Sequence, residues 1–254
     1  MLSLKKAFLI SLSLTILFFL IDLSKISGYF LRNYEIYLVY KVIDGDTIEL
    51  SNGEKVRLLG INAPEVGEKY YEEARDFLSN LIEGKEVILE TDLEKKDNYG
   101  RKLAFVFLGD LNINVEMVKS GLAHTYKLNK ISKYKNELEK AEALAMSSEV
   151  GIWKKSNISC IKLIDLKIYG EEKVVIKNDC NFTIQLNNWT LEDESHNRFT
   201  FPPYLFKEGE TIEIYTMNKT ARFTFRKNFP IWNRDGDSLF LRDSQGLLVL
   251  FYRY

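Results

Sequence analysis

The pattern of apolar residues changes near residue 155, and this change constrains the fold more than any other feature of the chain. Before it, alternating apolar segments are mixed with segments whose apolar residues recur at helical spacing. After it, helical spacing disappears and short β-branched segments follow one another. The segment WKKSNIS, which begins at Trp153, has the composition of a linker. The sequence therefore predicts two domains, at residues 34–155 and 160–254.

Five strands and three helices are predicted in the first domain. Turn dipeptides such as Asp-Gly and Asn-Gly separate the strands, and apolar residues at helical spacing place a helix between the third and fourth strands. The strands are predicted at 36–43, 46–51, 54–60, 86–92 and 103–108, and two further helices near 112–120 and 132–147. This order suits a closed, five-stranded Greek-key barrel of the oligonucleotide-binding (OB) type.

The second domain is predicted to be an immunoglobulin-like β-sandwich. Its predicted strands lie at 161–168, 173–178, 182–187, 211–216, 221–226, 238–242 and 247–252. About seven short strands separated by turn residues are typical of such a sandwich. The fold class of the whole chain is therefore mainly β with some α.

Two cysteines flank the first predicted hairpin of the sandwich. A three-residue turn at 169–171 places Cys160 opposite Cys180, whereas a turn shifted by one residue separates them. A disulfide and two buried free thiols both remain open.

The N-terminus has the features of an export signal. Lys5 and Lys6 precede an uncharged run from Ala7 to Ile21. Its length lies between that of a signal-peptide core and the roughly 20 apolar residues of a membrane span. Residues 1–28 are thus expected to be a cleaved signal peptide or an uncleaved membrane anchor. The rest of the chain is expected outside the cytoplasm, either secreted or anchored, because the positive residues stay inside.

The composition excludes a disordered chain and a polycation. The chain is 46% hydrophobic and 28% charged, with a net charge of −1. Any contact with nucleic acid must therefore come from a local patch. The stretch KSGLAHTYKLNKISKYK, which contains Tyr126, offers lysines to phosphates and tyrosines to bases, although a solvated helix face explains it equally well. Within it, His124 is expected to be a surface or structural residue.

Three stretches of the first domain place charged residues at strand ends. They are VIDGDTIEL with Asp44 and Asp46, RLLGINAPE with Arg57 and Glu65, and DNYGRKLAFV with Asp97, Tyr99, Arg101 and Lys102. Each stretch alone is an ordinary turn. Together they supply what cleavage of a phosphodiester needs: arginine forks for the phosphate, hard oxygen ligands for a cation, and a carboxylate that can act on water.

Six motifs in this order resemble the thermonuclease (staphylococcal nuclease-like) family over residues 36–155. They are IDGDT, RLLGINAPE, EEARDFL, DNYGRKLA, VKSGLA and GIW. The resemblance implies an OB-type barrel and Ca²⁺-dependent endonuclease hydrolysis of DNA and RNA that leaves 3′-phosphate ends.

The resemblance also implies roles for individual residues. Arg57 and Arg101 match the arginines that clamp the phosphate, and Glu65 matches the carboxylate that activates water. Asp46 matches a calcium ligand, and Asp44 matches a neighbouring acid of the same pocket.

Candidates for substrate binding come from the same stretches. Tyr99 matches a tyrosine beside the substrate phosphate, and Lys102 and Tyr126 are further candidates. The chain departs from the family at Asn62, where a second calcium-ligating aspartate is usual. An amide oxygen still coordinates Ca²⁺, but with one negative charge fewer, so we expect weaker calcium binding or tolerance of another divalent cation.

The second domain resembles a lamin tail domain over about 160–254. The resemblance rests on IQLNNWTLEDE, FTFPPYLFKEGETIEIYT and IWNRDGDSLFLRDSQGLLVLFY. It implies a role in binding or tethering, with a partner that the sequence does not identify. Asp235, Gly236 and Asp237 repeat the Asp-Gly-Asp of the barrel without arginine or base partners, so we interpret them as structural.

The leading hypothesis is an exported nuclease whose barrel is catalytic and whose sandwich binds or tethers. The alternative is a non-catalytic protein that binds nucleic acid or the envelope and keeps the nuclease fold. A structural surface protein leaves the six ordered motifs unexplained.

Overall fold

A computed structural model describes residues 35–254. The expected signal peptide or anchor at 1–28 lies outside the described residues. From Tyr37 to Tyr254 the chain forms one compact unit. None of the helices in the described part has the length and apolar character that crossing a membrane requires.

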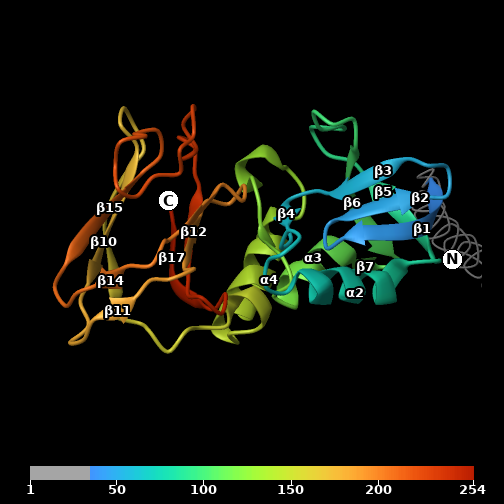
Figure 1. Cartoon of the computed structure of the whole chain (residues 1–254). Coiled ribbons are helices and arrows are strands. Elements are labelled where there is room, and N and C mark those ends of the chain that lie inside the picture. The colour runs from blue at the N-terminus through green and yellow to red at the C-terminus, as the bar shows by residue number, and fades with distance from the viewer. Residues whose placement is uncertain (1–34) are drawn as a thin grey trace, which may run out of the picture. The chain divides into compact units, whose positions relative to one another are not determined.

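The first half of this unit is a closed barrel, as predicted (Figure 1). In the described residues its five strands are β1 (Ile36–Asp44), β2 (Thr47–Leu50), β3 (Lys55–Leu58), β5 (Glu86–Glu90) and β6 (Lys102–Leu108). Neighbours in the order β3-β2-β1-β5-β6 are hydrogen-bonded, and a parallel pairing of β3 with β6 closes the barrel. Short β7 (Leu111–Asn112) folds back and pairs antiparallel with the end of β6.

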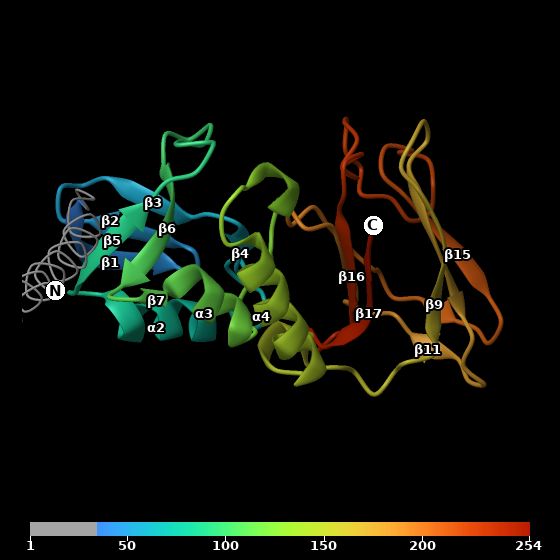
Figure 2. The same ribbon diagram turned by 180° about the vertical axis from the view of Figure 1, so that it is seen from behind.

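Helices cover one side of the barrel (Figure 2). They are α2 (Tyr71–Ile82), α3 (Ile113–Lys119) and α4 (Lys135–Ser147), close to the predicted positions. Ala74, Leu78 and Ile82 of α2 share one helix face and lie fully buried in the barrel core. Short β4 (Ile61–Asn62) pairs with β8 (His124–Thr125), and single 3₁₀ turns follow as η1 (Leu128–Lys130) and η2 (Gly151–Trp153).

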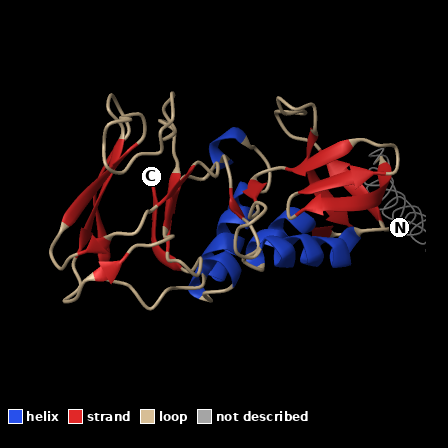
Figure 3. Cartoon of the chain, in the orientation of Figure 1, coloured by secondary structure: helices blue, strands red, loops and turns tan. Residues whose placement is uncertain are grey.

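The second half consists of strands and loops, and residues 160–254, all of them described, contain no helix (Figure 3). Its strands are β9 (Ile161–Lys167), β10 (Lys173–Asn178), β11 (Ile184–Gln185), β12 (Thr190–Glu192), β13 (Arg198–Thr200), β14 (Leu205–Phe206), β15 (Thr211–Tyr215), β16 (Ser238–Arg242) and β17 (Leu248–Arg253). They form a sheet β15-β10-β9, a sheet β13-β12-β16-β17 and the pair β11-β14. The predicted immunoglobulin-like, strand-rich fold is confirmed.

Two details of the strand prediction are wrong. Residues 221–226 form no strand, because their alternating Phe223 and Phe225 fill the core while the backbone pairs only with Tyr215. Conversely, the two-residue strands β4, β7, β8 and β14 were not predicted, and neither were β12 and β13. The last two are only three residues long and border a polar turn, so their alternation is too brief to stand out from a loop.

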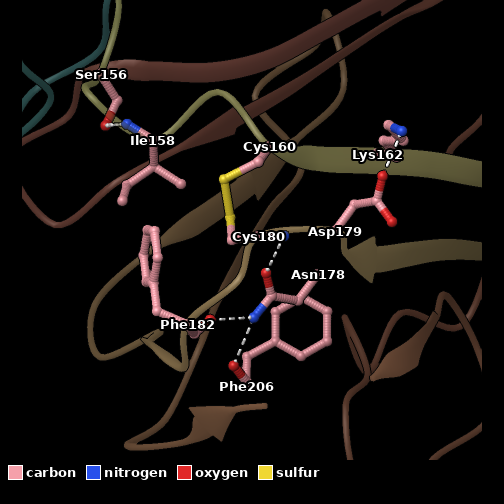
Figure 4. The surroundings of a disulfide bond; sticks show 9 residues. All are labelled: Ser156, Ile158, Cys160, Lys162, Asn178, Asp179, Cys180, Phe182 and Phe206. Atoms are coloured by element: carbon pink, nitrogen blue, oxygen red, sulfur yellow. Dashed lines mark hydrogen bonds and ion pairs between the residues drawn. A yellow bond between two sulfur atoms is a disulfide. The ribbon is translucent and has the colours of Figure 1, made fainter. Parts of the chain in front are cut away.

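The cysteines are joined by a disulfide (Figure 4). Cys160 and Cys180 have a Cα–Cα distance of 5.1 Å, within the range that a bridge requires. A register shift in the pairing of β9 with β10, between Val175 and Ile176, brings Asp179 opposite Cys160, and the disulfide joins Cys160 to the next residue. Of the two arrangements left open by the sequence, the free thiols are excluded.

The expected linker begins inside a hydrophobic core. Trp153 is 1% exposed, and its ring centroid lies 5.9 Å from that of Phe240 and 5.0 Å from that of Phe251. The backbone of Lys155 forms an isolated parallel β-bridge with Leu248 of β17. The lysine and serine residues of this segment favoured a linker. The indole of Trp153, however, has a large apolar surface, and its burial stabilises the folded chain. The domain boundaries 34–155 and 160–254 stay predictions.

Candidate active site

One pocket brings together every predicted site residue except Lys102. Its walls come from the ends of β1, β3 and β4, the turn before β6, and the segment after β8. The predicted residues that line it are Asp44, Asp46, Arg57, Asn62, Glu65, Tyr99, Arg101 and Tyr126.

Arg57 forms an ion pair and a hydrogen bond with two other residues of this pocket. It lies opposite Thr47 in the β2–β3 register, so its side chain starts next to Asp46. Arg57 Nη1 lies 2.9 Å from Asp46 Oδ2, and Arg57 Nη2 donates to Asn62 Oδ1. The side chain is 12% exposed, so its charge is little screened by water. The guanidinium is thus held in place by two of the predicted cation ligands.

The two aspartates share a tight turn. Asp44 Oδ1 accepts from Asp46 N at 3.0 Å, and Asp46 Oδ2 accepts from Ala63 N at 2.8 Å. A Cβ on Gly45 would lie 2.6 Å from the Cβ of Ala63, so the turn requires glycine. Burial, followed by the neighbouring charge of Asp46, raises the pKa of Asp44 to about 6. Burial thus disfavours the charged form of Asp44, and a bound cation would favour it.

Arg101 is held by the turn that precedes β6. Its Nε lies 2.7 Å from Asp97 Oδ2, and its Nη1 donates to Thr47 Oγ1 at 3.3 Å. Burial alone would raise the pKa of Asp97, but hydrogen bonds from Arg101 lower it below its ordinary value. The Tyr99 ring lies 5.5 Å from the guanidinium carbon and is 87% exposed. This edge of the pocket therefore presents a cation and an open aromatic face.

Glu65 lies on the loop between β4 and α2, and it is exposed. Its backbone N donates to Glu68 Oε2 at 2.9 Å, which fixes the loop. An exposed carboxylate on a fixed loop is accessible to water.

Lys102 does not line the pocket. Its Nζ lies 3.0 Å from Glu54 Oε2 and donates to Tyr37 Oη at 3.2 Å. Adjacent residues of an extended strand point to opposite faces, so Lys102 leaves the face that Arg101 approaches. His124 is buried and packs 5.0 Å from the ring of Phe240, which agrees with a structural role and not a surface one.

The pocket contains ligands suited to a hard divalent cation. Asp44 and Asp46 contribute carboxylate oxygens and Asn62 an amide oxygen, and Ca²⁺ prefers such ligands. A separate group, Glu68, Glu192 and His196, also places its ligand atoms within 4.8 Å of one another. Its carboxylates, however, already pair with the guanidinium of Arg198.

Two residues of the pocket wall were not predicted as site residues. Ser195 and His196 belong to the second half of the unit, yet they line this pocket. Their only signal is a polar run, EDESHN, between two apolar stretches. Such a run predicts a turn, but it does not show which surface the turn faces.

Comparison with known proteins agrees with this geometry. The family described as Staphylococcal nuclease homologue matches residues 55–155, and the Lamin Tail Domain matches residues 132–254. A thermonuclease of Staphylococcus intermedius is 38% identical over 130 residues, which cover 48% of this chain and 77% of the relative. A thermonuclease of Staphylococcus hyicus is 35% identical over 138 residues, covering 51% and 82%.

An uncharacterised endonuclease of Haemophilus influenzae is 37% identical over 125 residues, covering 47% of this chain and 66% of the relative. With the barrel, the pocket and these relatives in agreement, the chain belongs to the staphylococcal nuclease family of phosphodiester hydrolases and carries a lamin tail domain after its nuclease domain.

Proposed function

We propose that this protein is a Ca²⁺-dependent endonuclease that hydrolyses DNA or RNA and leaves 3′-phosphate ends. One observation carries the proposal: a single pocket holds two anchored arginines, a pair of neighbouring aspartates, and an exposed glutamate. Hydrolysis of a phosphodiester requires these three kinds of group together.

The arginines bind the phosphate. Arg57 and Arg101 approach the pocket from β3 and from the turn before β6, and each is held by an acid, Asp46 or Asp97. A guanidinium offers several N–H donors in one plane, so each arginine can hold its aspartate and still donate to a non-bridging oxygen. Because the two cations are fixed before substrate arrives, they stabilise charge that develops in the transition state at little reorganisation cost.

Glu65 acts on the water. Its carboxylate is exposed in the pocket, and the hydrogen bond from its backbone N to Glu68 fixes the loop that carries it. A carboxylate in this position orients a water molecule or accepts its proton.

Asp46, Asp44 and Asn62 would hold the cation. Bound Ca²⁺ supplies positive charge beside the scissile phosphate. With an amide at residue 62 in place of a carboxylate, the site carries less negative charge, so we expect a higher calcium requirement or use of another divalent cation.

The open edge of the pocket favours a single strand. Tyr99 is exposed, and Tyr126, Lys127 and Lys130 also line the pocket. Exposed aromatic rings stack on bases, and lysines contact the phosphates between them.

We also propose where the enzyme works. The N-terminal run from Ala7 to Ile21 behind two lysines favours export, with the nuclease outside the cytoplasm and either secreted or anchored at the membrane. The lamin tail domain would bind or tether a partner there.

A calcium titration of cleavage tests the proposed function. The full chain is incubated with a single-stranded DNA of defined sequence, with Ca²⁺ varied through the millimolar range, and product ends are identified by their response to 3′-phosphatase. We expect cleavage that rises with Ca²⁺, stops on chelation, and leaves 3′-phosphates. Binding of the DNA without cleavage at any Ca²⁺ concentration would instead favour the non-catalytic alternative.

A further inference from the structure

The lamin tail domain supplies part of the wall of the nuclease pocket. The turn Asp193–Asn197, called the sandwich turn below, joins β12 to β13. Its Ser195 and His196 line the same pocket as Glu65, and Ser195 Oγ lies 3.3 Å from the hydroxyl of Tyr126. The sandwich turn is therefore in contact with predicted substrate-binding and catalytic residues.

The first link runs through Asn62. Its Nδ2 donates to the backbone oxygen of Glu194 at 2.9 Å, while its Oδ1 accepts from Arg57. Asn62 is 5% exposed and Glu194 is 7% exposed, so water does not replace this hydrogen bond without rearrangement. An ionised aspartate has no N–H to donate and would face the Glu194 carbonyl with its own negative charge. The amide at residue 62, unusual for the family, thus matches the presence of the sandwich turn.

The second link runs to the loop of Glu65. Glu68 Oε2 accepts from Glu65 N at 2.9 Å. The other oxygen of Glu68 pairs with Arg198 and lies 3.2 Å from His196 Nδ1. Two side chains of the sandwich therefore hold the carboxylate that fixes the Glu65 loop.

The sandwich turn is itself rigidly built. Asp193 Oδ1 accepts from Ser195 N at 2.9 Å and from Asn197 N at 2.8 Å. Asp237 Oδ1 accepts from Glu194 N at 3.1 Å. These bonds fix the peptide groups on both sides of Glu194, so the direction of its carbonyl is set before it meets Asn62.

We propose that the sandwich turn, together with Arg198 directly after it, positions the nuclease site: Glu194 holds Asn62, and His196 and Arg198 hold the Glu65 loop through Glu68. The catalytic consequence rests on the proposed function, whereas the contacts themselves do not. The lamin tail domain is then a working part of the enzyme in addition to any tethering role. Removing a residue that orients a metal ligand through a hydrogen bond commonly lowers activity or metal affinity by about 10- to 100-fold.

Two matched arginines separate positioning from stability. Arg198 pairs with Glu68 beside the pocket, and Arg253 pairs with Glu142 of α4. Both belong to the sandwich, and their side chains are 32% and 33% exposed. In the full chain, we expect Arg198→Ala to lower kcat about tenfold with a smaller change in KM. We expect Arg253→Ala to lower the melting temperature but to leave kcat within about twofold of the parent.

The conservative variant sharpens the test. Arg198→Lys keeps a charge that can pair with Glu68 but loses the planar fork that also reaches Glu192, so part of the lost kcat should return. An unchanged kcat in Arg198→Ala, or an equal loss of kcat in Arg253→Ala, would overturn the proposal.

A readout without cleavage separates this proposal from the proposed function. Nuclear magnetic resonance measures how fast the side-chain amide protons of Asn62 exchange with water, and exposed Asn80 serves as the reference. We expect slow exchange at Asn62 in the parent, faster exchange in Asp237→Ala, which releases the backbone N of Glu194, and no change in Arg253→Ala. A parent that shows slow exchange but no nuclease activity would refute the proposed function alone. Exchange at Asn62 as fast as at Asn80 in an active parent would refute the positioning role alone.

Discussion

The tripeptide Asp-Gly-Asp occurs once in the barrel and once in the sandwich, with opposite surroundings. In the barrel, Asp46 faces the Arg57 guanidinium inside the pocket, and burial beside Asp46 raises the pKa of Asp44 to about 6. In the sandwich, Asp237 accepts hydrogen bonds from the backbone N of Glu194 and Ser238 and from both nitrogens of Asn233, at 2.7 to 3.1 Å.

The difference shows that partners, not the tripeptide, decide the role. The four donors around Asp237 satisfy its oxygens and organise a turn, which agrees with the structural interpretation from the sequence. The acids of the barrel accept fewer backbone hydrogen bonds each and line an open pocket beside a guanidinium, so a cation can reach them. The two segments are nevertheless connected, because Asp237 holds Glu194 and Glu194 holds Asn62.

The strongest challenge to this comparison is Asp46→Ala. Loss of this carboxylate removes a predicted cation ligand and the partner of Arg57, so we expect the cleavage rate to fall by at least about 10²-fold. The initial rate on single-stranded DNA at saturating Ca²⁺ measures it. Asp76→Ala, on the exposed side of α2, is the control and should cleave like the parent. A rate within threefold of the parent for Asp46→Ala would show that this acid is not catalytic.

The second challenge addresses stability. Asp237→Ala leaves several N–H groups without their acceptor in a buried turn, and we expect it to lower the free energy of unfolding by about 4 kcal/mol. Asp235→Ala, in the same tripeptide but exposed, should cost less than about 1 kcal/mol. Denaturation in urea measures both. Equal losses would mean that the hydrogen bonds of Asp237 do not organise the turn.

The disulfide tests a part of the sandwich that does not line the pocket. Cys160 and Cys180 are 20 residues apart, so the double serine variant should lose about 3 kcal/mol of stability, chiefly through a less constrained unfolded state. Neither residue lines the pocket, and cleavage at 25 °C should therefore be unchanged. Thermal unfolding and initial rates are measured on the same preparation. A large loss of rate in a folded variant would show that the sandwich influences the site through more than its turn.

The smallest effect is expected at the surface. Hydrogen bonds from Lys162 and then Lys177 lower the pKa of Asp179 to about 2. Because the folded state lowers this pKa, the contribution of Asp179 to stability is present above its ordinary value near 3.8 and is lost as pH falls toward 2. Asp179→Asn should flatten the melting temperature slightly over that interval. An identical pH profile would mean that the exposed pairs contribute nothing, as many such pairs do.

The sequence predicted the barrel and its pocket because their signals are local. Strand alternation, helical spacing and turn dipeptides are each encoded within a few residues. The six ordered motifs contain Arg57 of β3 and Glu65 and Arg101 of two loops, which the barrel brings together. Lys102 was placed wrongly beside Arg101 because neighbours in sequence lie on opposite faces of a strand.

The contribution of the sandwich was not predictable from one sequence. The hydrogen bond between Asn62 and Glu194 joins residues 132 positions apart. Asparagine and glutamate are both ordinary turn residues, so their types do not signal this contact. The contact forms only because one domain packs on the other. Trp153 shows the same limitation. The composition of the segment that begins there predicted a linker, but the Trp153 side chain is buried in a hydrophobic core.

The initial rate of Arg101→Ala on single-stranded DNA at saturating Ca²⁺ shows whether this pocket hydrolyses nucleic acid. Arg75→Ala, an exposed arginine of α2 that also pairs with acids, is the matched control. We predict that Arg101→Ala cleaves at least about 10²-fold more slowly than the parent, because a preorganised donor to the transition state is lost, while Arg75→Ala cleaves normally. Equal rates for the parent and for Arg101→Ala would contradict the account.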